Sequence, residues 1–141
     1  MRAQTMHGAG RRRLLGALLV AGALAACGPN ASNEAPPIPS GAWFTSWRDN
    51  GAGGHYLLQI ERGRALAEGR KMAGVIRTRS DCEPNGQNLN HCRYTIELSD
   101  DARIDVIDHH EVARYRSLQP GESIILLRFN SGWVVAQASG G

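Results

Sequence analysis

Residues 92–98 read Cys-Arg-Tyr-Thr-Ile-Glu-Leu and carry the clearest signal of fold class in the chain. Cys92, Tyr94, Ile96 and Leu98 alternate with polar residues, which is typical of a β-strand buried on one face. Similar runs predict further strands at residues 72–78, 103–107, 123–129, 133–138 and, less regularly, 55–62. The chain is therefore predicted to be mainly β, with about five to six short antiparallel strands.

Turn sequences separate these runs. Asn130-Ser131-Gly132 predicts a tight hairpin turn, and Pro120-Gly121 predicts a second turn within residues 118–122. One short helical turn is expected at residues 64–71. Short strands with turns every eight to twelve residues indicate a small barrel or sandwich. Tyr115 followed by the Pro-Gly turn and a last hairpin resembles small OB-like or SH3-like bacterial domains of unassigned function, and this resemblance implies a small barrel in residues 42–141.

The N-terminus has the pattern of an export signal. Arg11-Arg12-Arg13 precedes an apolar run, residues 14–26, which as a helix spans roughly 20 Å. That length is too short for a bilayer core of about 30 Å, so a signal peptide is expected and a transmembrane anchor is not. The run ends in Leu24-Ala25-Ala26-Cys27, which resembles the lipobox of bacterial lipoproteins. The resemblance implies cleavage of residues 1–26 and a thioether from Cys27 to diacylglycerol; the alternative is an ordinary signal peptide cut after Ala26.

Several residues near the cleavage site refine the predicted location. Gly28 in place of Asp favours the outer membrane over the inner one, by resemblance to enterobacterial lipoprotein sorting. Arg12-Arg13 loosely resembles a twin-arginine export signal, so general and twin-arginine export both stay open. Residues 27–41 comprise the lipidated cysteine and a proline-rich segment without apolar periodicity, which is typical of a semi-rigid tether.

The charge of the chain belongs mostly to this signal. The formal net charge is +3, from 16 basic and 13 acidic residues. Four of the basic residues lie in the first 26 positions, which contain no acidic residue, and removing them leaves 12 basic against 13 acidic. The folded part is therefore near neutral, and no nucleic acid partner is expected.

Cys82 and Cys92 remain as an even pair once Cys27 carries lipid. In an oxidising compartment such a pair predicts a structural disulfide, which would stabilise the fold by about 3 kcal/mol by closing this loop. A hairpin with Cys82 opposite Cys92 places Ile76 opposite Leu98, on the apolar face. A redox-active pair is the alternative, although nine intervening residues do not resemble Cys-x-x-Cys.

Asp108-His109-His110, within residues 105–111, is a cluster of metal-ligand types with two histidines. Adjacent histidines in a strand or turn point apart, so a polar turn between strands is expected here, and a metal-binding or enzymatic role of this cluster is the alternative. The sequence has no Gly-x-Ser-x-Gly motif and no phosphate-binding loop with its lysine. The chain is therefore not expected to be an enzyme or to bind a cofactor.

Two segments are candidates for binding. The loop at residues 83–91 is rich in amides, closed by the cysteine pair, and expected to display Leu89 among polar groups. Its candidate binding residues are Asn85, Gln87, Asn88 and Leu89. Trp43, Phe44 and Trp47 are expected to cap the open end of a barrel, with Trp43 and Trp47 as an alternative platform for a protein or glycan.

These features predict a lipid-anchored envelope protein that faces the periplasm and has a non-enzymatic binding or structural role. Its expected partners are the membrane, through the anchor, and an envelope protein or glycan. A small metal-binding protein or enzyme that uses Asp108, His109 and His110 is one alternative. An inhibitor of an envelope-directed hydrolase, with the closed loop as a plug, is the other.

Overall fold

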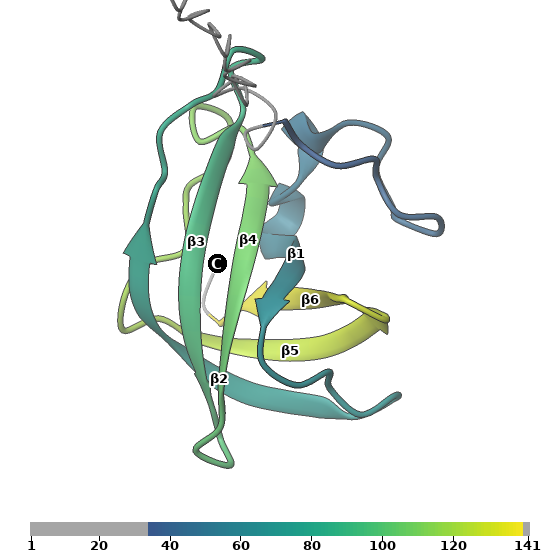
Figure 1. The fold of residues 1–141 in the computed structure, drawn as a ribbon, viewed down its shortest axis with the longest axis vertical. Coiled ribbons are helices and arrows are strands. Elements are labelled where there is room, and N and C mark those ends of the chain that lie inside the picture. The colour runs from purple at the N-terminus through teal and green to yellow at the C-terminus, as the bar shows by residue number, and fades with distance from the viewer. Residues whose placement is uncertain (1–33, 140–141) are drawn as a thin grey trace, which may run out of the picture.

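The computed structural model describes residues 34–139, and Cys27 with the predicted signal peptide lies outside them. The fold is a closed barrel in which all neighbouring strands are antiparallel (Figure 1). The strands are β1 (His55–Arg62), β2 (Lys71–Ser80), β3 (Asn90–Leu98), β4 (Arg103–His110), β5 (Ser123–Asn130) and β6 (Trp133–Ala138). The prediction of a mainly β chain that forms a small OB-like or SH3-like barrel is confirmed.

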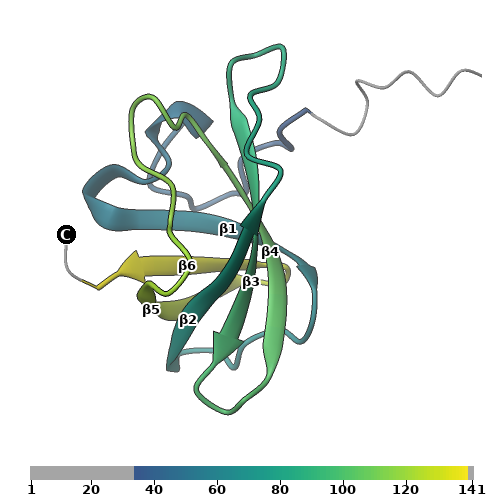
Figure 2. The same cartoon turned by 90° about the vertical axis from the view of Figure 1, so that its left-hand side faces the viewer.

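The strand order around the barrel is β1-β4-β3-β2-β5-β6, with β6 pairing back to β1. Strands β2, β3 and β4 form a meander, and β5 and β6 form a hairpin (Figure 2). The predicted turns at residues 118–122 and 130–132 are both present. No helix within residues 34–139 has the length and apolar character needed to span a bilayer.

The interior is filled by alternating side chains from every strand. Cys92, Tyr94, Ile96 and Leu98 of β3 are all buried, as their period of two predicts. The same alternation on the other strands buries Leu58, Ile76, Ile104, Val106, Ile124, Leu126 and Val134 in one cluster. Closing the sheet into a barrel thus gives each inward side chain apolar neighbours from several strands.

A second apolar cluster lies on the outer face of the barrel wall. Phe44 and Trp47 pack there against Leu57 and Leu89, whereas the neighbours of Leu57 on β1 point into the interior. The prediction that the aromatic residues cap the barrel end is wrong in this respect, because they cover the wall instead. Ala35 and Ile38 pack on the same cluster, and Trp47 Nε1 donates to the Pro36 carbonyl at 2.7 Å. Part of the predicted tether therefore contributes to the packed domain.

The register between β2 and β3 differs from the expected one by two residues at Ile76 and by one residue at Ser80, which lies opposite Arg93. Ile76 lies opposite Ile96, and Gly74 lies opposite Leu98. At Gly74 a Cβ atom would come within 2.9 Å of Ile96 Cγ2, so glycine permits this close approach of the strands. A bulge between Ile76 and Thr78 then turns Thr78 to the outside, and such bulges bend strands where barrels close.

Two local predictions are wrong. Residues 64–70 contain no helix, because Gly69 adopts a φ of +70° and Leu66 is pulled into the core. Asp108, His109 and His110 form the buried end of β4 instead of a polar turn. The strand continues there because Asp108 and His109 have hydrogen-bond partners inside the protein in place of water, and His110 Nδ1 lies 3.1 Å from the Asp108 carboxylate. His110 Nε2 is buried without a hydrogen-bond partner among the described residues.

Candidate functional site

A cleft of about 380 Å³ lies on the outside of the barrel, next to the loop that joins β2 to β3. The loop rises beyond the barrel wall at one end of the molecule (Figure 2). The cleft is polar on most sides, and its lining residues are Asp81, Glu83, Pro84, Asn85, His91, Arg93, Ile107 and His109. It therefore joins part of the sequence-predicted binding loop to the outward faces of β3 and β4.

The base of the loop is fixed by covalent and backbone links. Cys82 and Cys92 form the predicted disulfide. The Asn90 side chain donates to the Cys82 carbonyl at 2.6 Å, and Pro84 forms an isolated β-bridge with Asn90. These contacts hold the two ends of the loop together and fix their position relative to β3.

The Asn85 side chain stabilises the loop through hydrogen bonds to the loop backbone. Its Oδ1 accepts the backbone N–H groups of Gln87 at 2.8 Å and Leu89 at 3.0 Å. Leu89 is only 7% exposed and packs with Phe44 and Trp47. The expectation that the loop displays Leu89 is therefore wrong, because the aromatic layer over the barrel wall covers this side chain. Gln87 and Asn88 remain exposed at the tip.

A chain of side-chain contacts runs from this loop across the barrel wall. Since Asn85 Oδ1 faces two backbone donors, its Nδ2 faces His91 Nε2, at 2.8 Å, and donates to it. His91 therefore carries its proton on Nδ1, which lies 2.6 Å from His109 Nδ1. His109 accepts there and donates from Nε2 to Gln59 Oε1 at 3.0 Å. With the lowered pKa of His109, these contacts favour the tautomer of His109 that accepts at Nδ1 and donates from Nε2.

The environment of His109 keeps its ring neutral. The ring packs against Trp47, with centroids 5.2 Å apart, and against Trp133 at 6.4 Å. Burial, together with the nearby His91 and His110, lowers the pKa of His109 to about 3. An imidazole in this setting can accept or donate a hydrogen bond at neutral pH but does not supply charge to the cleft.

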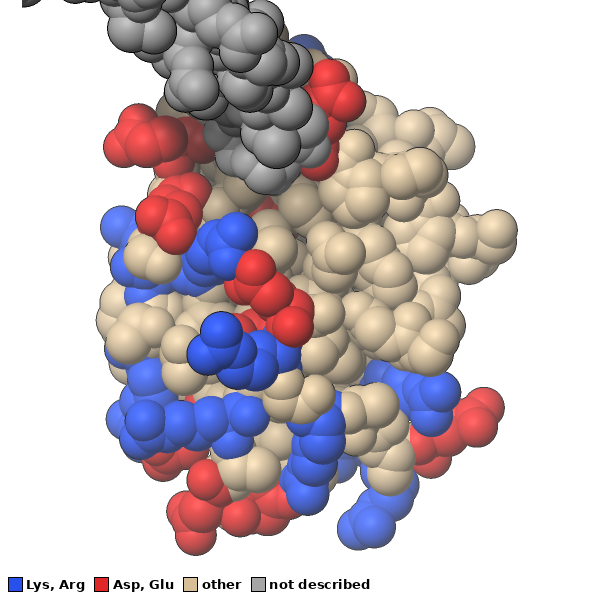
Figure 3. Space-filling model, in the orientation of Figure 1, with Lys and Arg blue, Asp and Glu red and all other residues tan. Residues whose placement is uncertain are grey.

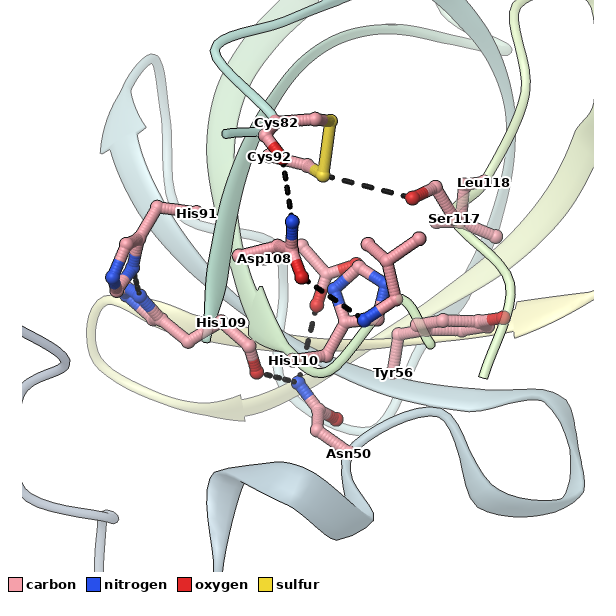
Figure 4. A network of polar contacts seen from close by, with 12 residues as sticks. Asn50, Tyr56, Cys82, His91, Cys92, Asp108, His109, His110, Ser117 and Leu118 are labelled. Atoms are coloured by element: carbon pink, nitrogen blue, oxygen red, sulfur yellow. Dashed lines mark hydrogen bonds and ion pairs between the residues drawn. A yellow bond between two sulfur atoms is a disulfide. The ribbon is translucent and has the colours of Figure 1, made fainter. Parts of the chain in front are cut away.

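A buried polar network lies on the other side of β4 (Figure 4). The Nδ2 group of Asn50 contacts the carbonyls of Leu57 and His109 at 3.0 Å and Asp108 Oδ1 at 3.2 Å, and Asn50 Oδ1 accepts the Leu57 N–H at 2.7 Å. Asn50 ends the 3₁₀ helix at Trp47–Asp49, so this side chain ties the N-terminal segment to β1 and β4.

Asp108 is the centre of the inner network. Its Oδ2 lies 3.1 Å from His110 Nδ1 and 3.4 Å from the Tyr94 hydroxyl, which in turn accepts the Leu118 N–H. Burial lowers the pKa of His110, but the adjacent Asp108 carboxylate outweighs it and raises the pKa overall. Asp108 and His110 are both 0% exposed, so neither can touch a substrate or ligand in this conformation.

The predicted cluster at residues 108–110 is therefore split by the strand. His109 points outward to His91, whereas His110 points inward to Asp108, as expected for adjacent histidines (Figure 4). Within residues 34–139, no group of three or more His, Cys, Asp or Glu side chains is placed to hold a metal ion. Asp108, His109 and His110 therefore do not point to one common metal position.

The structure brings some of the sequence-predicted site residues together and separates others. Asn85 lines the cleft, and Trp47 is only 6% exposed beneath it, against His109. Trp43 is 46% exposed and contacts Phe44 and Phe129, away from the lining of the cleft. Gln59 was not expected at the site, although its place between the buried residues of β1 could have marked it as outward-facing.

Comparison with protein-family models, curated proteins and solved structures gave no match. The chemistry of the cleft therefore has to be derived from its own side chains. It offers amide, imidazole and carboxylate hydrogen-bonding groups on a preformed frame, together with one guanidinium, Arg93, which pairs with Glu61 and Asp81.

Proposed function

We propose that this chain is a bacterial lipoprotein, anchored through Cys27 in the outer membrane and facing the periplasm, whose barrel is a non-enzymatic binding module. Its binding surface is the β2–β3 loop together with the adjoining cleft. The partner is an envelope protein or glycan that presents hydrogen-bonding groups to the exposed amides of Gln87 and Asn88.

The observation that supports the binding role is the internal order of the loop. Three features order the loop: the disulfide joins its ends, Asn85 accepts hydrogen bonds from its backbone, and Leu89 is buried. The Gln87 carbonyl also accepts Arg48 Nη2 at 3.2 Å. A loop that is ordered before binding loses little conformational entropy on binding, so its exposed amides can contribute net affinity.

The lipobox resemblance supports the anchor. A thioether-linked diacylglycerol supplies two acyl chains, which suffice for stable membrane attachment. We expect Cys27→Ser to abolish lipidation and to move the protein out of the detergent phase on phase partitioning. Unchanged partitioning of this variant would refute the lipoprotein assignment and leave the binding role of the loop to be tested separately.

Site-specific photo-cross-linking in the bacterial envelope tests the binding role. A photoreactive residue at Asn88 is expected to give a discrete cross-linked product, because Asn88 lies at the exposed tip of the loop. The matched control is Gln137, which is exposed on β6. The product should disappear in a Gln87→Ala background. Equal labelling from both positions, or none from Asn88, would refute the proposed surface.

A further inference from the structure

A second cleft, of about 590 Å³, lies at the opposite end of the barrel from the β2–β3 loop. Its walls come from the β1–β2 connection, the β3–β4 turn and the end of β5 (Figure 1). The cleft is lined by Arg64, Arg70 and Arg128, with Asp100 as its one carboxylate. Its volume is within the range of small-molecule sites.

Two of the cations in this cleft have no ion-pair partner, unlike most Lys and Arg side chains in the described chain. Eight of the twelve Lys and Arg side chains in residues 34–139 form an ion pair with Asp or Glu. The four without one are Arg70, Lys71, Arg79 and Arg128. Two of these four line the same cleft, and Lys71 is adjacent to it in the chain.

The balance of charge within the cleft is positive. Arg64 pairs with Asp100, so the single lining carboxylate is already engaged. Three guanidinium groups against one carboxylate leave a formal net charge of about +2 in the lining, which favours the entry of an anion. In Figure 3 the lower and left parts of this face carry intermixed basic and acidic side chains, whereas the upper right carries few charges.

The side chains that line the cleft indicate which class of anion it can bind. Guanidinium groups match the oxygens of phosphate in a bidentate geometry, and they keep their charge at every physiological pH. The lining also includes the apolar side chains of Ala65, Ala67 and Met72. A ligand with a phosphate head and an adjoining apolar part would contact both kinds of side chain.

We propose that this cleft is a binding site for a phosphate-bearing ligand, held by Arg70 and Arg128 with Arg64 at its edge. The site is separate from the β2–β3 loop and does not depend on the binding role proposed for that loop. The phosphate can belong to a lipid headgroup or to a soluble molecule, and the following experiment distinguishes these sources.

The test uses the lipidated protein purified from membranes in nonionic detergent, with arginine side-chain NMR resonances as the readout. Inorganic pyrophosphate is titrated in one arm, and short-chain phosphatidylglycerol is titrated in the other, with phosphatidylcholine as the zwitterionic comparison. We expect saturable shifts of a subset of arginine signals. Tighter binding of phosphatidylglycerol than of pyrophosphate supports a lipid source, and the opposite order supports a soluble one.

Matched variants connect the signal to the cleft. Arg70→Ala/Arg128→Ala is expected to weaken binding at least tenfold, whereas Arg79→Ala, which removes an exposed unpaired cation on β2 outside the cleft lining, should change it less than twofold. Neither Arg70 nor Arg128 has an ion-pair partner to lose, so the melting temperature serves as a check on folding. Absence of saturable binding in both arms, or equal weakening by Arg79→Ala, would overturn the proposal.

Discussion

Replacing Asn50 by Ala tests whether the N-terminal segment is a structural part of the barrel. Asn50 is fully buried and makes four side-chain hydrogen bonds, to both backbone groups of Leu57, to the His109 carbonyl and to Asp108. Alanine leaves all four of these partners in place without a hydrogen bond from residue 50. The loss of unfolding free energy in this variant therefore comes mainly from buried polar groups without a hydrogen-bond partner, and less from lost apolar contact.

The magnitude follows from the number of groups left unsatisfied. A buried donor or acceptor without a partner costs about 1–3 kcal/mol. Asp108 keeps its contacts with His110 and Tyr94, so the backbone groups of Leu57 and His109 carry most of the penalty. With partial relaxation we expect a loss of about 3–5 kcal/mol in the free energy of unfolding, a large share of the 5–15 kcal/mol typical of a domain.

Urea unfolding of the soluble chain from residue 28 onward measures this loss through tryptophan fluorescence, since Trp47 and Trp133 stack near Asn50 in the outer cluster. Asn130→Ala is the matched control, because Asn130 Oδ1 is buried without a hydrogen-bond partner. Asn130→Ala should lower the free energy of unfolding by much less than Asn50→Ala does. A loss below about 1 kcal/mol for Asn50→Ala would refute the view that this side chain ties the N-terminal segment to β1 and β4.

Two further predictions concern the loop and the histidine pair. The Cys82→Ala/Cys92→Ala variant should lose roughly 2–4 kcal/mol of unfolding free energy, and thiol counting on the denatured, unreduced wild-type chain from residue 28 should find no free thiol; two reactive thiols would contradict the structural disulfide. His109 has a folded-state pKa of about 3, below its unfolded value, so the unfolded state binds the proton first and stability falls as the pH drops below about 6.5. Between pH 6 and 4.5 the loss should approach about 1.4 kcal/mol per pH unit, and His109→Gln should show a shallower slope in urea titrations. An unchanged slope would contradict a neutral His109 ring in the folded protein.

The strand pattern was predictable because it depends on local alternation. The burial of every second residue (Cys92, Tyr94 and Ile96) follows from the alternation of apolar and polar residues in the local sequence. The same alternation places His91 and Thr95 on the outer face of the barrel. The disulfide followed from counting cysteines in a predicted oxidising compartment. These inferences need no knowledge of which strands are neighbours.

The outer aromatic cluster and the register were not predictable in the same way. Trp47 packs on Leu57, Leu89 and Trp133, which come from three distant segments, and nothing in the local sequence says that these meet outside the barrel. The bulge after Ile76 depends on how β2 must bend to pair with both β3 and β5. Asp108 and His110 look like turn residues because the sequence does not show the buried partners that stabilise them.

The end of β4 links the two halves of the candidate site. Asp108 and His110 point into the barrel, and His109 between them points outward to His91, which contacts Asn85 in the loop. The His109 carbonyl and the Asp108 carboxylate both contact Asn50, so the backbone that positions the outer histidine is held from inside. The loop therefore takes its position from four elements (the N-terminal segment, β1, β3 and β4) and not from its own sequence alone. A change at Asn50 or Gln59 should consequently alter binding at the loop without touching a partner, whereas a change at Gln87 should alter binding and leave the barrel stable.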